Sequence, residues 1–256
     1  MPPPGPAVRS VAPVSRHLYV LELDGMPQSA LDLDDPTHLE FDYVRRIGDL
    51  LDLLPGGRLP ERRLAVLHVG GAAMTLPRYV HATRPGSAQI VLEPDASLVA
   101  RVRTEAPLPS RSGIKVRTVD GAAGIAAVRD DSQDVVILDA FDGAHVPHDL
   151  IGASFLQQVG RVLAPGGLLV ANLRDRAPFP LVRDFVAAAR TLDGRGLGEV
   201  VVGLEPSTAK AKREGNVLVA AGTLPPQPFG SPPPSQYRVL VGAAVRDSFG
   251  GGSVRA

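Results

Sequence analysis

Two aspartates follow a short apolar run in the middle of the chain. Asp139 comes directly after the residues VVIL, and Asp142 stands three positions later, just before Gly143. If VVIL is a buried strand, both carboxylates lie where that strand leaves its sheet. Carboxylates at such a position can hold a cationic substrate or take a proton from an amine. The alternative is that the pair only caps a loop.

Three further segments have the residue types that bind a nucleoside. The run LAVLHV leads into Gly70 and Gly71, whose small size lets the backbone approach a ligand at the start of a helix. Glu93 ends the next apolar run, where a carboxylate can accept hydrogen bonds from ribose hydroxyls. Asp120 and Gly121 end the third run, where they suit an adenine ring, or where Asp120 simply caps the next helix.

These segments favour a nucleoside ligand but do not choose between NAD and S-adenosylmethionine. The dinucleotide motif G-x-G-x-x-G is absent, because Gly70 and Gly71 are followed by AAMT. No G-x-S-x-G motif of a serine hydrolase occurs either. His68 lies inside a strand-like run, and we expect it to be a packed strand histidine rather than a ligand of a metal.

The elements that position these residues follow from hydrophobic periodicity. Short apolar runs alternate with segments of helical spacing, which is typical of parallel strands buried on both faces. We predict strands at 63–69, 88–92, 114–119, 134–138, 167–172, 199–204 and 216–221, and helices near 75–84, 95–104, 121–129, 150–163 and 178–191. This pattern predicts a doubly wound α/β sheet, which binds ligands at the carboxyl ends of its strands.

The region before this sheet differs in pattern. Residues 17–33 predict a hairpin that turns at Asp24-Gly25, and Asp35 predicts a helix N-cap with Pro36 at the first helical position. The expected division is a disordered tail (1–16), a hairpin and helix (17–62), a nucleoside-binding domain (63–222), and a proline-rich linker with a C-terminal extension (223–256).

The composition excludes several classes of protein. Among 256 residues, 27 Lys and Arg balance 27 Asp and Glu, so a basic surface for nucleic acid is not indicated. Cysteine is absent, which excludes disulfides and thiolate metal sites. No stretch approaches the ~20 apolar residues that cross a bilayer. We therefore expect a cytoplasmic protein that binds neither nucleic acid nor membranes and holds no metal.

Several stretches resemble the spermidine synthase (aminopropyltransferase) family. LDGMPQSALDLDDPTHLEF is similar to the N-terminal signature of that family. VLHVGGAAMTLPRYV and QIVLEPDASL resemble its glycine loop and ribose-binding strand, and QDVVILDAFDG resembles its catalytic-loop strand. The similarity covers roughly residues 17–222. It implies a Rossmann-like class I S-adenosylmethionine-dependent methyltransferase fold with a small N-terminal β-hairpin region.

The resemblance also implies roles for individual residues. Asp139 matches the general base, and Asp142 matches the aspartate that holds the substrate amine. Gln28, His38 and Glu40 match positions that bind substrate or lie near the nucleoside. The remaining matches are to the co-substrate: Gly70 and Gly71 in the glycine loop, Glu93 at the ribose, and Asp120 with Gly121 at the adenine. The implied partner is a small-molecule amine, and a homodimer is compatible with the family.

The chain departs from the family at three places. The glycine loop of the family reads G-G-G-D-G, and its aspartate holds the ammonium of decarboxylated S-adenosylmethionine. Here that position is Ala73 or close to it. A Tyr-His pair is replaced by His38-Leu39, and a tyrosine expected before the last core strand is missing. Without the aspartate, the repulsion of the carboxylate of ordinary S-adenosylmethionine is lost, so both co-substrates stay open.

Three functions are compatible with these residues. The first is transfer of an aminopropyl group from decarboxylated S-adenosylmethionine to a polyamine. The second is methyl transfer from S-adenosylmethionine on the same scaffold. The third is a catalytically silent protein that keeps the nucleoside pocket. The two aspartates favour an enzyme, whereas Ala73 and Leu39 favour the second and third functions.

Overall fold

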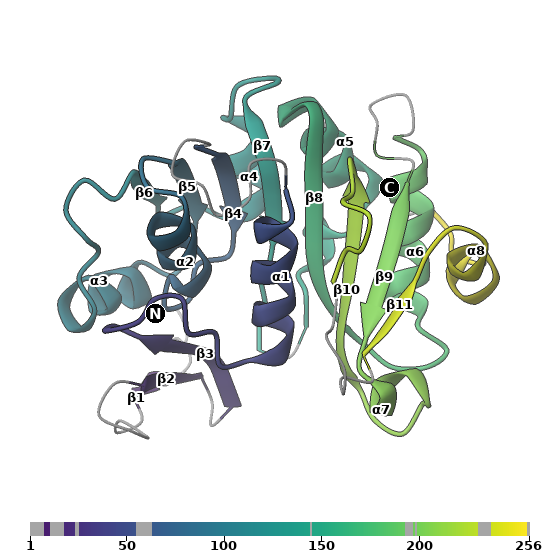
Figure 1. Ribbon diagram of the computed structural model, residues 1–256, viewed down its shortest axis with the longest axis horizontal. Helices are drawn as coiled ribbons and strands as arrows, with labels where there is room; N and C mark the ends of the chain where they lie inside the picture. Colours follow the sequence, from purple (N-terminus) through teal and green to yellow (C-terminus); the bar gives the residue numbers. More distant parts are fainter. Residues whose placement is uncertain are drawn as a thin grey trace, which may run out of the picture.

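A computed structural model describes residues 8–10, 18–23, 26–54, 63–143, 145–192, 197, 199–229 and 237–254. Its centre is an eight-stranded sheet in the order β11-β9-β10-β8-β7-β4-β5-β6 (Figure 1). The strands are β4 Ala65–Val69, β5 Ala88–Leu92, β6 Ile114–Arg117, β7 Gln133–Leu138, β8 Leu163–Asp175, β9 Val200–Leu204, β10 Gly215–Gly222 and β11 Arg238–Leu240. All seven predicted strands of this sheet are confirmed, and β11 is an addition at its edge.

The strand order creates a crevice beside β4. Strands β4 to β8 pair in parallel, β10 runs antiparallel between β8 and β9, and β11 is antiparallel to β9. The chain leaves β4 toward β5 and β6 on one side and returns to β7 and β8 on the other. Ligands of doubly wound sheets bind at such a reversal, outside the carboxyl ends of the strands.

Helices cover both faces of the sheet (Figure 1). They are α1 Asp42–Asp52, α2 Thr75–Thr83, α3 Ala96–Glu105, α4 Gly121–Ala126, α5 Ala153–Val162, α6 Pro180–Arg190, α7 Pro206–Ala209 and α8 Ala243–Phe249, with a short 3-10 helix η1 at His148–Leu150. Helices α4, α5, α6 and α8 pack on one face, and α1 and α2 pack on the other. In the described part of the chain, no helix combines the length and apolarity needed to cross a membrane.

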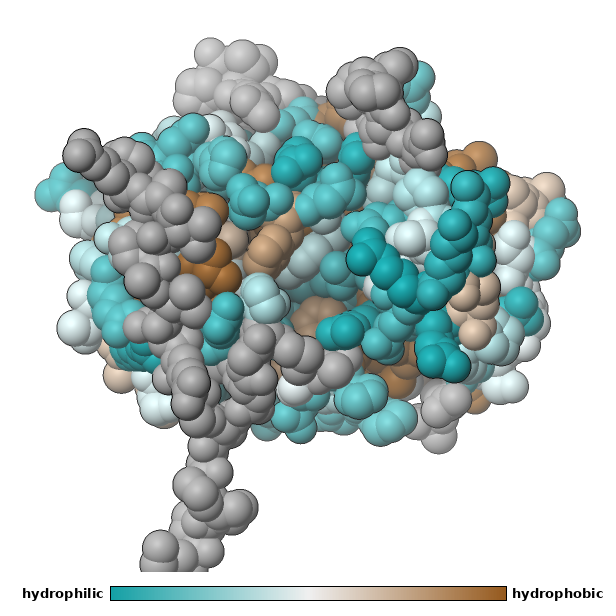
Figure 2. Space-filling view, turned by 90° about the horizontal axis from the view of Figure 1, so that it is seen from below, coloured by the Kyte–Doolittle hydropathy of each residue, from teal (hydrophilic) through white to brown (hydrophobic). Residues whose placement is uncertain are grey.

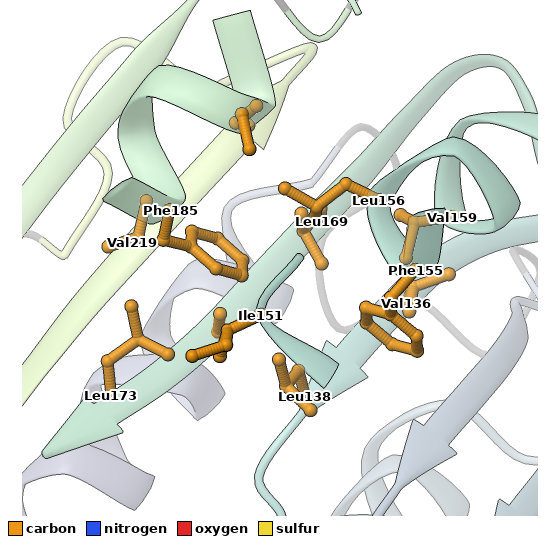
Figure 3. Close-up of a cluster of buried hydrophobic side chains, with 14 of the residues drawn as sticks. Val136, Leu138, Ile151, Phe155, Leu156, Val159, Leu169, Leu173, Phe185 and Val219 are labelled. Atoms are coloured by element: carbon orange, nitrogen blue, oxygen red, sulfur yellow. The ribbon is translucent and has the colours of Figure 1, made fainter. Parts of the chain in front are cut away.

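Strand β7 shows why its sequence is apolar without alternation. Val136 and Leu138 face the α5 and α6 side, whereas Val135 and Ile137 face α1 and α2. Figure 3 shows the first of these cores, in which Phe155 of α5 and other large side chains lie against β7 and β8. Because both faces are buried, every position of VVIL is apolar, and Asp139 is the first polar residue after the strand end.

The N-terminal part forms a separate small antiparallel sheet. Strands β2 Leu18–Leu23 and β3 Met26–Asp32 confirm the predicted hairpin, although its predicted Asp24-Gly25 turn lies outside the described residues. β1 Val8–Ser10 pairs with β2, so this piece of the predicted disordered tail is instead a strand. Figure 1 places this sheet beside the lower edge of the central sheet.

The predicted start of the first helix is wrong. The Asp35 carboxylate accepts a hydrogen bond from the backbone of Thr37 at 3.0 Å, which closes a local turn rather than a helix end. Helix α1 begins only at Asp42, after Phe41, which provides no side-chain cap. From there Ile47 and Leu50 are buried at helical spacing. Helix α1 ends at Asp52, and residues 55–62 lie outside the described part of the chain.

The C-terminal segment continues the same core. Strand β11 pairs with β9, and Val245 and Phe249 of α8 are buried in the core cluster shared with α6. The ring of Phe249 lies 5.5 Å from that of Phe179, at the start of α6. The described part of the predicted extension thus adds the edge strand β11 and the helix α8 to the central sheet and its core. The division of the chain into domains stays a prediction.

Candidate active site

A cavity of about 870 Å³ opens at the carboxyl ends of β4, β5 and β7. Its walls come from the hairpin strand β3, the first turns of α1 and α2, the loops after β5 and β6, and the loop after β7. Figure 2 looks onto this side of the molecule, where the surface is hollowed near its centre and both hydrophilic and hydrophobic residues border the hollow. The strand reversal beside β4 therefore does coincide with a cavity.

Most of the predicted site residues meet in this cavity. Its lining includes Gln28, Gly70, Gly71, Glu93, Asp120, Gly121, Asp139 and Asp142. His38 and Glu40 are not brought to it. They lie in the connection before α1, are about half exposed, and hydrogen-bond each other at 3.2 Å. Because α1 starts later than predicted, the first turn that faces the cavity carries Tyr43 and Val44 instead.

The glycine loop has a strained backbone. Gly70 has φ +96°, and a Cβ there would lie 2.2 Å from the carbonyl oxygen of Asp139, so only glycine fits. Ala72 and Met74 also adopt positive φ, which costs side-chain-bearing residues energy. Ala73 is buried in a cluster with Met74 and Leu98 and does not line the cavity, whereas Ala72 does. The loop therefore presents Ala72, and not Ala73, to a ligand.

Glu93 holds this loop in place. Its Oε2 accepts hydrogen bonds from the backbone N–H groups of Gly71 at 3.0 Å and Ala72 at 3.2 Å, and its Oε1 accepts from the N–H of Asp95 at 3.1 Å. A carboxylate has about four lone-pair sites, so capacity for one ribose hydroxyl remains. The ribose contact stays a prediction. The loop N–H groups, which would otherwise attract an anion, are already bound to a carboxylate.

Asp120 caps α4. Its Oδ1 accepts a hydrogen bond from the N–H of Ala123 at 2.7 Å, so the simpler of its two predicted roles is confirmed. A Cβ on Gly121 would approach Val69 to 2.5 Å and Leu150 to 2.8 Å, which shows how closely the backbone passes the cavity wall. A contact of this pair with an adenine ring is compatible with the cap and stays a prediction.

Asp139 lies at the centre of the site. Its Oδ1 accepts a hydrogen bond from Nδ2 of Asn172 at 2.9 Å, and the hydroxyl of Tyr43 donates to the same carboxylate. Burial raises the pKa of Asp139 to about 6, although both hydrogen bonds act to lower it. Burial and the charge of Asp139 hold the pKa of Tyr43 well above its usual value, so the phenol stays a donor.

Neither Tyr43 nor Asn172 was among the predicted site residues. Asn172 follows the apolar run LLVA in β8, and its neighbour Ala171 pairs with Leu138 in the register of β7 and β8. The sequence could have indicated Asn172, because a polar residue that follows an apolar run can be expected near the same end of the sheet as Asp139. Tyr43 could not be found this way, because its contact depends on how α1 packs on the sheet.

The loop after β7 contacts the hairpin. Nε2 of Gln28 donates to the carbonyl oxygen of Gly143 at 3.4 Å, and the backbones of Asp142 and His145 form an isolated bridge. Asp142 is exposed at the cavity wall. Its position suits the predicted contact with an amine, which stays a prediction.

The cavity is acidic. Its carboxylates are those of Glu93, Asp95, Asp120, Asp139, Asp142 and Asp149, and the described lining residues include no lysine or arginine. His68 also lines it, but burial lowers the pKa of His68 to about 4, so the ring is neutral near pH 7. A cavity of one charge sign attracts ligands of the opposite sign, so this one favours cations. The described residues contain no group of three or more His, Asp or Glu side chains arranged to hold a metal.

Comparison with known proteins finds chains with a similar fold. No protein-family model matches the chain. The polyamine aminopropyltransferase of Chromobacterium violaceum is 26% identical over 146 residues, which are 57% of this chain and 53% of that protein. The match thus spans about half the length of this relative. A probable spermidine synthase from Corynebacterium glutamicum superposes with a TM-score of 0.85 over 97% of this chain and 92% of that one, at 25% identity.

The chain is thus similar to polyamine aminopropyltransferases and spermidine synthases, from which it has diverged in sequence. Its Rossmann-like class I methyltransferase fold is also confirmed. Human methyltransferase-like protein 13, in complex with SAH, matches the fold of this chain with a TM-score of 0.55 over 74% of it and 83% of that chain, at 23% identity. The eEF1A lysine and N-terminal methyltransferase of Xenopus laevis is 26% identical over 158 residues, which are 58% of this chain and 23% of that protein.

Proposed function

We propose that the protein transfers the aminopropyl group of decarboxylated S-adenosylmethionine to an aliphatic amine. One observation carries the proposal: Asp139, with a pKa raised to about 6, stands in a cavity whose described charged residues are all carboxylates. Both substrates of such a reaction are cations. The resemblance to a polyamine aminopropyltransferase supports the same reaction class.

The reaction forms a C–N bond and breaks a C–S bond. The amine nitrogen attacks the methylene beside the sulfonium, the sulfur leaves as the neutral thioether of methylthioadenosine, and the nitrogen loses one proton. An aliphatic amine is mostly protonated at pH 7, since a lysine side chain has a reference pKa near ~10.4. Asp139 takes up the proton, and a base with a pKa close to the working pH is suited to this. Tyr43 and Asn172 hold the carboxylate in position.

The same cavity favours the decarboxylated co-substrate. Ordinary S-adenosylmethionine carries a carboxylate that would meet Asp95, Asp139 and their acidic neighbours. The loop N–H groups that would compensate it already bind Glu93. On sequence grounds, the missing loop aspartate left both co-substrates open. The remaining carboxylates of the cavity replace the repulsion that this aspartate would exert on the carboxylate of S-adenosylmethionine.

A methyltransferase is the second candidate. It is favoured by the 26% identity to the eEF1A lysine and N-terminal methyltransferase and by the position of His38 and Glu40 outside the cavity. Both candidates use the same nucleoside site, so the tail of the co-substrate separates them.

Calorimetric titration of the protein with the two co-substrates tests the proposal. We expect decarboxylated S-adenosylmethionine to bind at least about tenfold more tightly than S-adenosylmethionine, with methylthioadenosine as the neutral control. A tenfold ratio corresponds to about 1.4 kcal/mol, which is less than the ~4 kcal/mol between two unit charges about 4 Å apart at an effective dielectric constant near 20. Equal or tighter binding of S-adenosylmethionine would contradict the proposal and favour the methyltransferase.

A further inference from the structure

The N-terminal turn of α1, residues 42–46, connects two distant parts of the molecule. Tyr43 and Arg46 are three residues apart, so their side chains leave the helix on the same face. The hydroxyl of Tyr43 donates a hydrogen bond to Asp139 at the end of β7. The guanidinium carbon of Arg46 lies 4.6 Å from the centre of the ring of Tyr237. This turn therefore links the carboxylate in the cavity to the C-terminal segment of the chain.

Arg46 is almost completely buried. Its side chain is 8% exposed, and its Nε and Nη2 donate to the carboxylate of Asp42, one turn earlier, at 3.4 and 3.2 Å. A buried guanidinium is costly without partners, and an aromatic face attracts it more strongly where water is excluded. The ring of Tyr237 supplies such a face. The position of Arg46, and with it the position of the N-terminal turn of α1, therefore depends on where this ring lies.

The ring of Tyr237 is held by the central sheet. It packs against the apolar cluster that α1 and α2 form with the sheet. A Cβ on Gly203 of β9 would lie 2.8 Å from a carbon of this ring and 2.9 Å from a ring carbon of Phe229, so the strand has a glycine where the two aromatic rings lie. Tyr237 directly precedes β11, which pairs with β9. The pairing of β11 therefore places the ring that covers Arg46.

We propose that Tyr237 is a positioning residue of the active site, which holds the N-terminal turn of α1 through Arg46 so that Tyr43 reaches Asp139. The helix has no side-chain cap at its start, so the order of this turn depends on its contacts with other elements. Tyr237 does not line the cavity, and its effect on the reaction passes through α1. The kinetic consequence rests on the proposed function, which the proposal extends to a residue outside the cavity.

The position of Tyr43 has a measurable effect on Asp139. The hydrogen bond from Tyr43 lowers the pKa of this carboxyl, which burial raises to about 6. Loss of this donor therefore raises the pKa further. Among the other groups at this site, Asn172 is neutral, and burial lowers the pKa of His68 in β4 to about 4. The further titratable side chains of the described cavity, which every variant below retains, are Glu93, Asp95, Asp120, Asp142 and Asp149.

Titration of the Asp139 carboxyl by carbon NMR in the unliganded protein tests the proposal. Tyr237→Leu removes the ring from Arg46 without changing the charge of the protein near pH 7, and the pKa of Asp139 should rise, as it should in Tyr43→Phe. Tyr237→Phe keeps the ring and should retain the wild-type pKa. Phe249→Leu is the matched control, because Phe249 belongs to the same C-terminal segment but is buried on the opposite face of the sheet. It should lower the Tm and leave the pKa of Asp139 unchanged.

A double variant separates an effect through Tyr43 from a general loss of stability. With Tyr43→Phe already present, Tyr237→Leu should raise the pKa of Asp139 no further, because the donor that it positions is absent. An equal further rise, or an unchanged pKa in folded Tyr237→Leu protein, would overturn the proposal.

The rate of product formation gives a second measurement. In Tyr237→Leu the acidic limb of the pH–rate profile should move to higher pH, so that the rate near pH 6 falls severalfold, whereas Phe249→Leu should leave the limb in place. A limb that stays in place in Tyr237→Leu as well would contradict the proposal. If the wild-type protein forms no product, the proposed function fails, and the NMR titration still decides the role of Tyr237.

Discussion

At the scale of single residues, Asp139 is the group on which the proposed chemistry depends. Asp139→Asn keeps the size and most hydrogen bonding of the side chain but removes the base. We expect the rate of product formation to fall about 10²-fold or more, with methylthioadenosine affinity near that of the wild type. Asp142→Asn should mainly weaken amine binding, because its proposed role is electrostatic. Steady-state kinetics on both variants check this, and full activity of Asp139→Asn would contradict the mechanism.

The pH dependence of catalysis follows from the same group. Asp139 must be ionised to accept a proton, and its pKa is raised to about 6. The rate at saturating substrate should therefore increase from pH 5 to pH 7 and level off above. A rate that is already constant at pH 5 would mean that the base has an ordinary carboxylate pKa or is another residue.

The raised pKa of Asp139 also has a consequence for stability. The folded state binds this proton more tightly than the unfolded chain, whose aspartates have a pKa near ~3.9. The contribution of Asp139 to stability is therefore greatest below pH 4 and is lost as the pH rises through about 6. Asp139→Asn should gain thermal stability relative to the wild type between pH 4 and pH 7. Melting curves across this range would show no such gain if Asp139 were solvated.

Glu93 has two roles in this account, since it holds the glycine loop and is predicted to bind the ribose. Glu93→Ala leaves the N–H groups of Gly71 and Ala72 without their acceptor. We expect methylthioadenosine to bind about tenfold more weakly or worse, together with a lower Tm. Unchanged affinity in a folded variant, measured by calorimetry, would mean that the ribose lies elsewhere.

At the scale of elements, the turn from β4 to α2 is the part of the fold that shapes the site. Gly70→Ala would bring a Cβ to 2.2 Å from the backbone of Asp139 at a positive φ, so we expect a large loss of stability and of nucleoside binding. Gly242→Ala is the matched control, because Gly242 also has a positive φ but no atom within 4 Å of a Cβ. Equal Tm values for the two variants would show that the close approach is unimportant.

The elements themselves were largely predictable, and the contacts between them were not. Apolar runs located β4, β5 and β7, and the acidic residue that follows each of the last two placed Glu93 and Asp139 at the ends of their strands. The orientation of Ala73 was not readable, because it depends on the positive φ of the neighbouring loop residues. The contact of Tyr43 with Asp139 was also out of reach, since it depends on how two elements far apart in the sequence pack.

At the scale of the whole molecule, charge is distributed unevenly although the chain is neutral. Acidic side chains gather in the cavity, while the chain carries 27 basic and 27 acidic residues in all. Composition therefore gave no hint of a cation site. We expect diamine binding to weaken severalfold when the salt concentration rises from 0.05 to 0.5 M, because charge attraction is screened. Binding of neutral methylthioadenosine should change little, and calorimetry at both salt concentrations measures the difference.

The central claim is the transfer of an aminopropyl group, and product analysis tests it most directly. The purified protein is incubated with 1,4-diaminobutane and decarboxylated S-adenosylmethionine, and in parallel with S-adenosylmethionine, and products are separated by chromatography. From the mixture with decarboxylated S-adenosylmethionine we predict methylthioadenosine and an aminopropylated amine in equal amounts. The Asp139→Asn variant should lose both products. The mixture with S-adenosylmethionine should give no S-adenosylhomocysteine. Tight nucleoside binding with neither product across a panel of diamines and polyamines would contradict the claim and favour a catalytically silent binding protein.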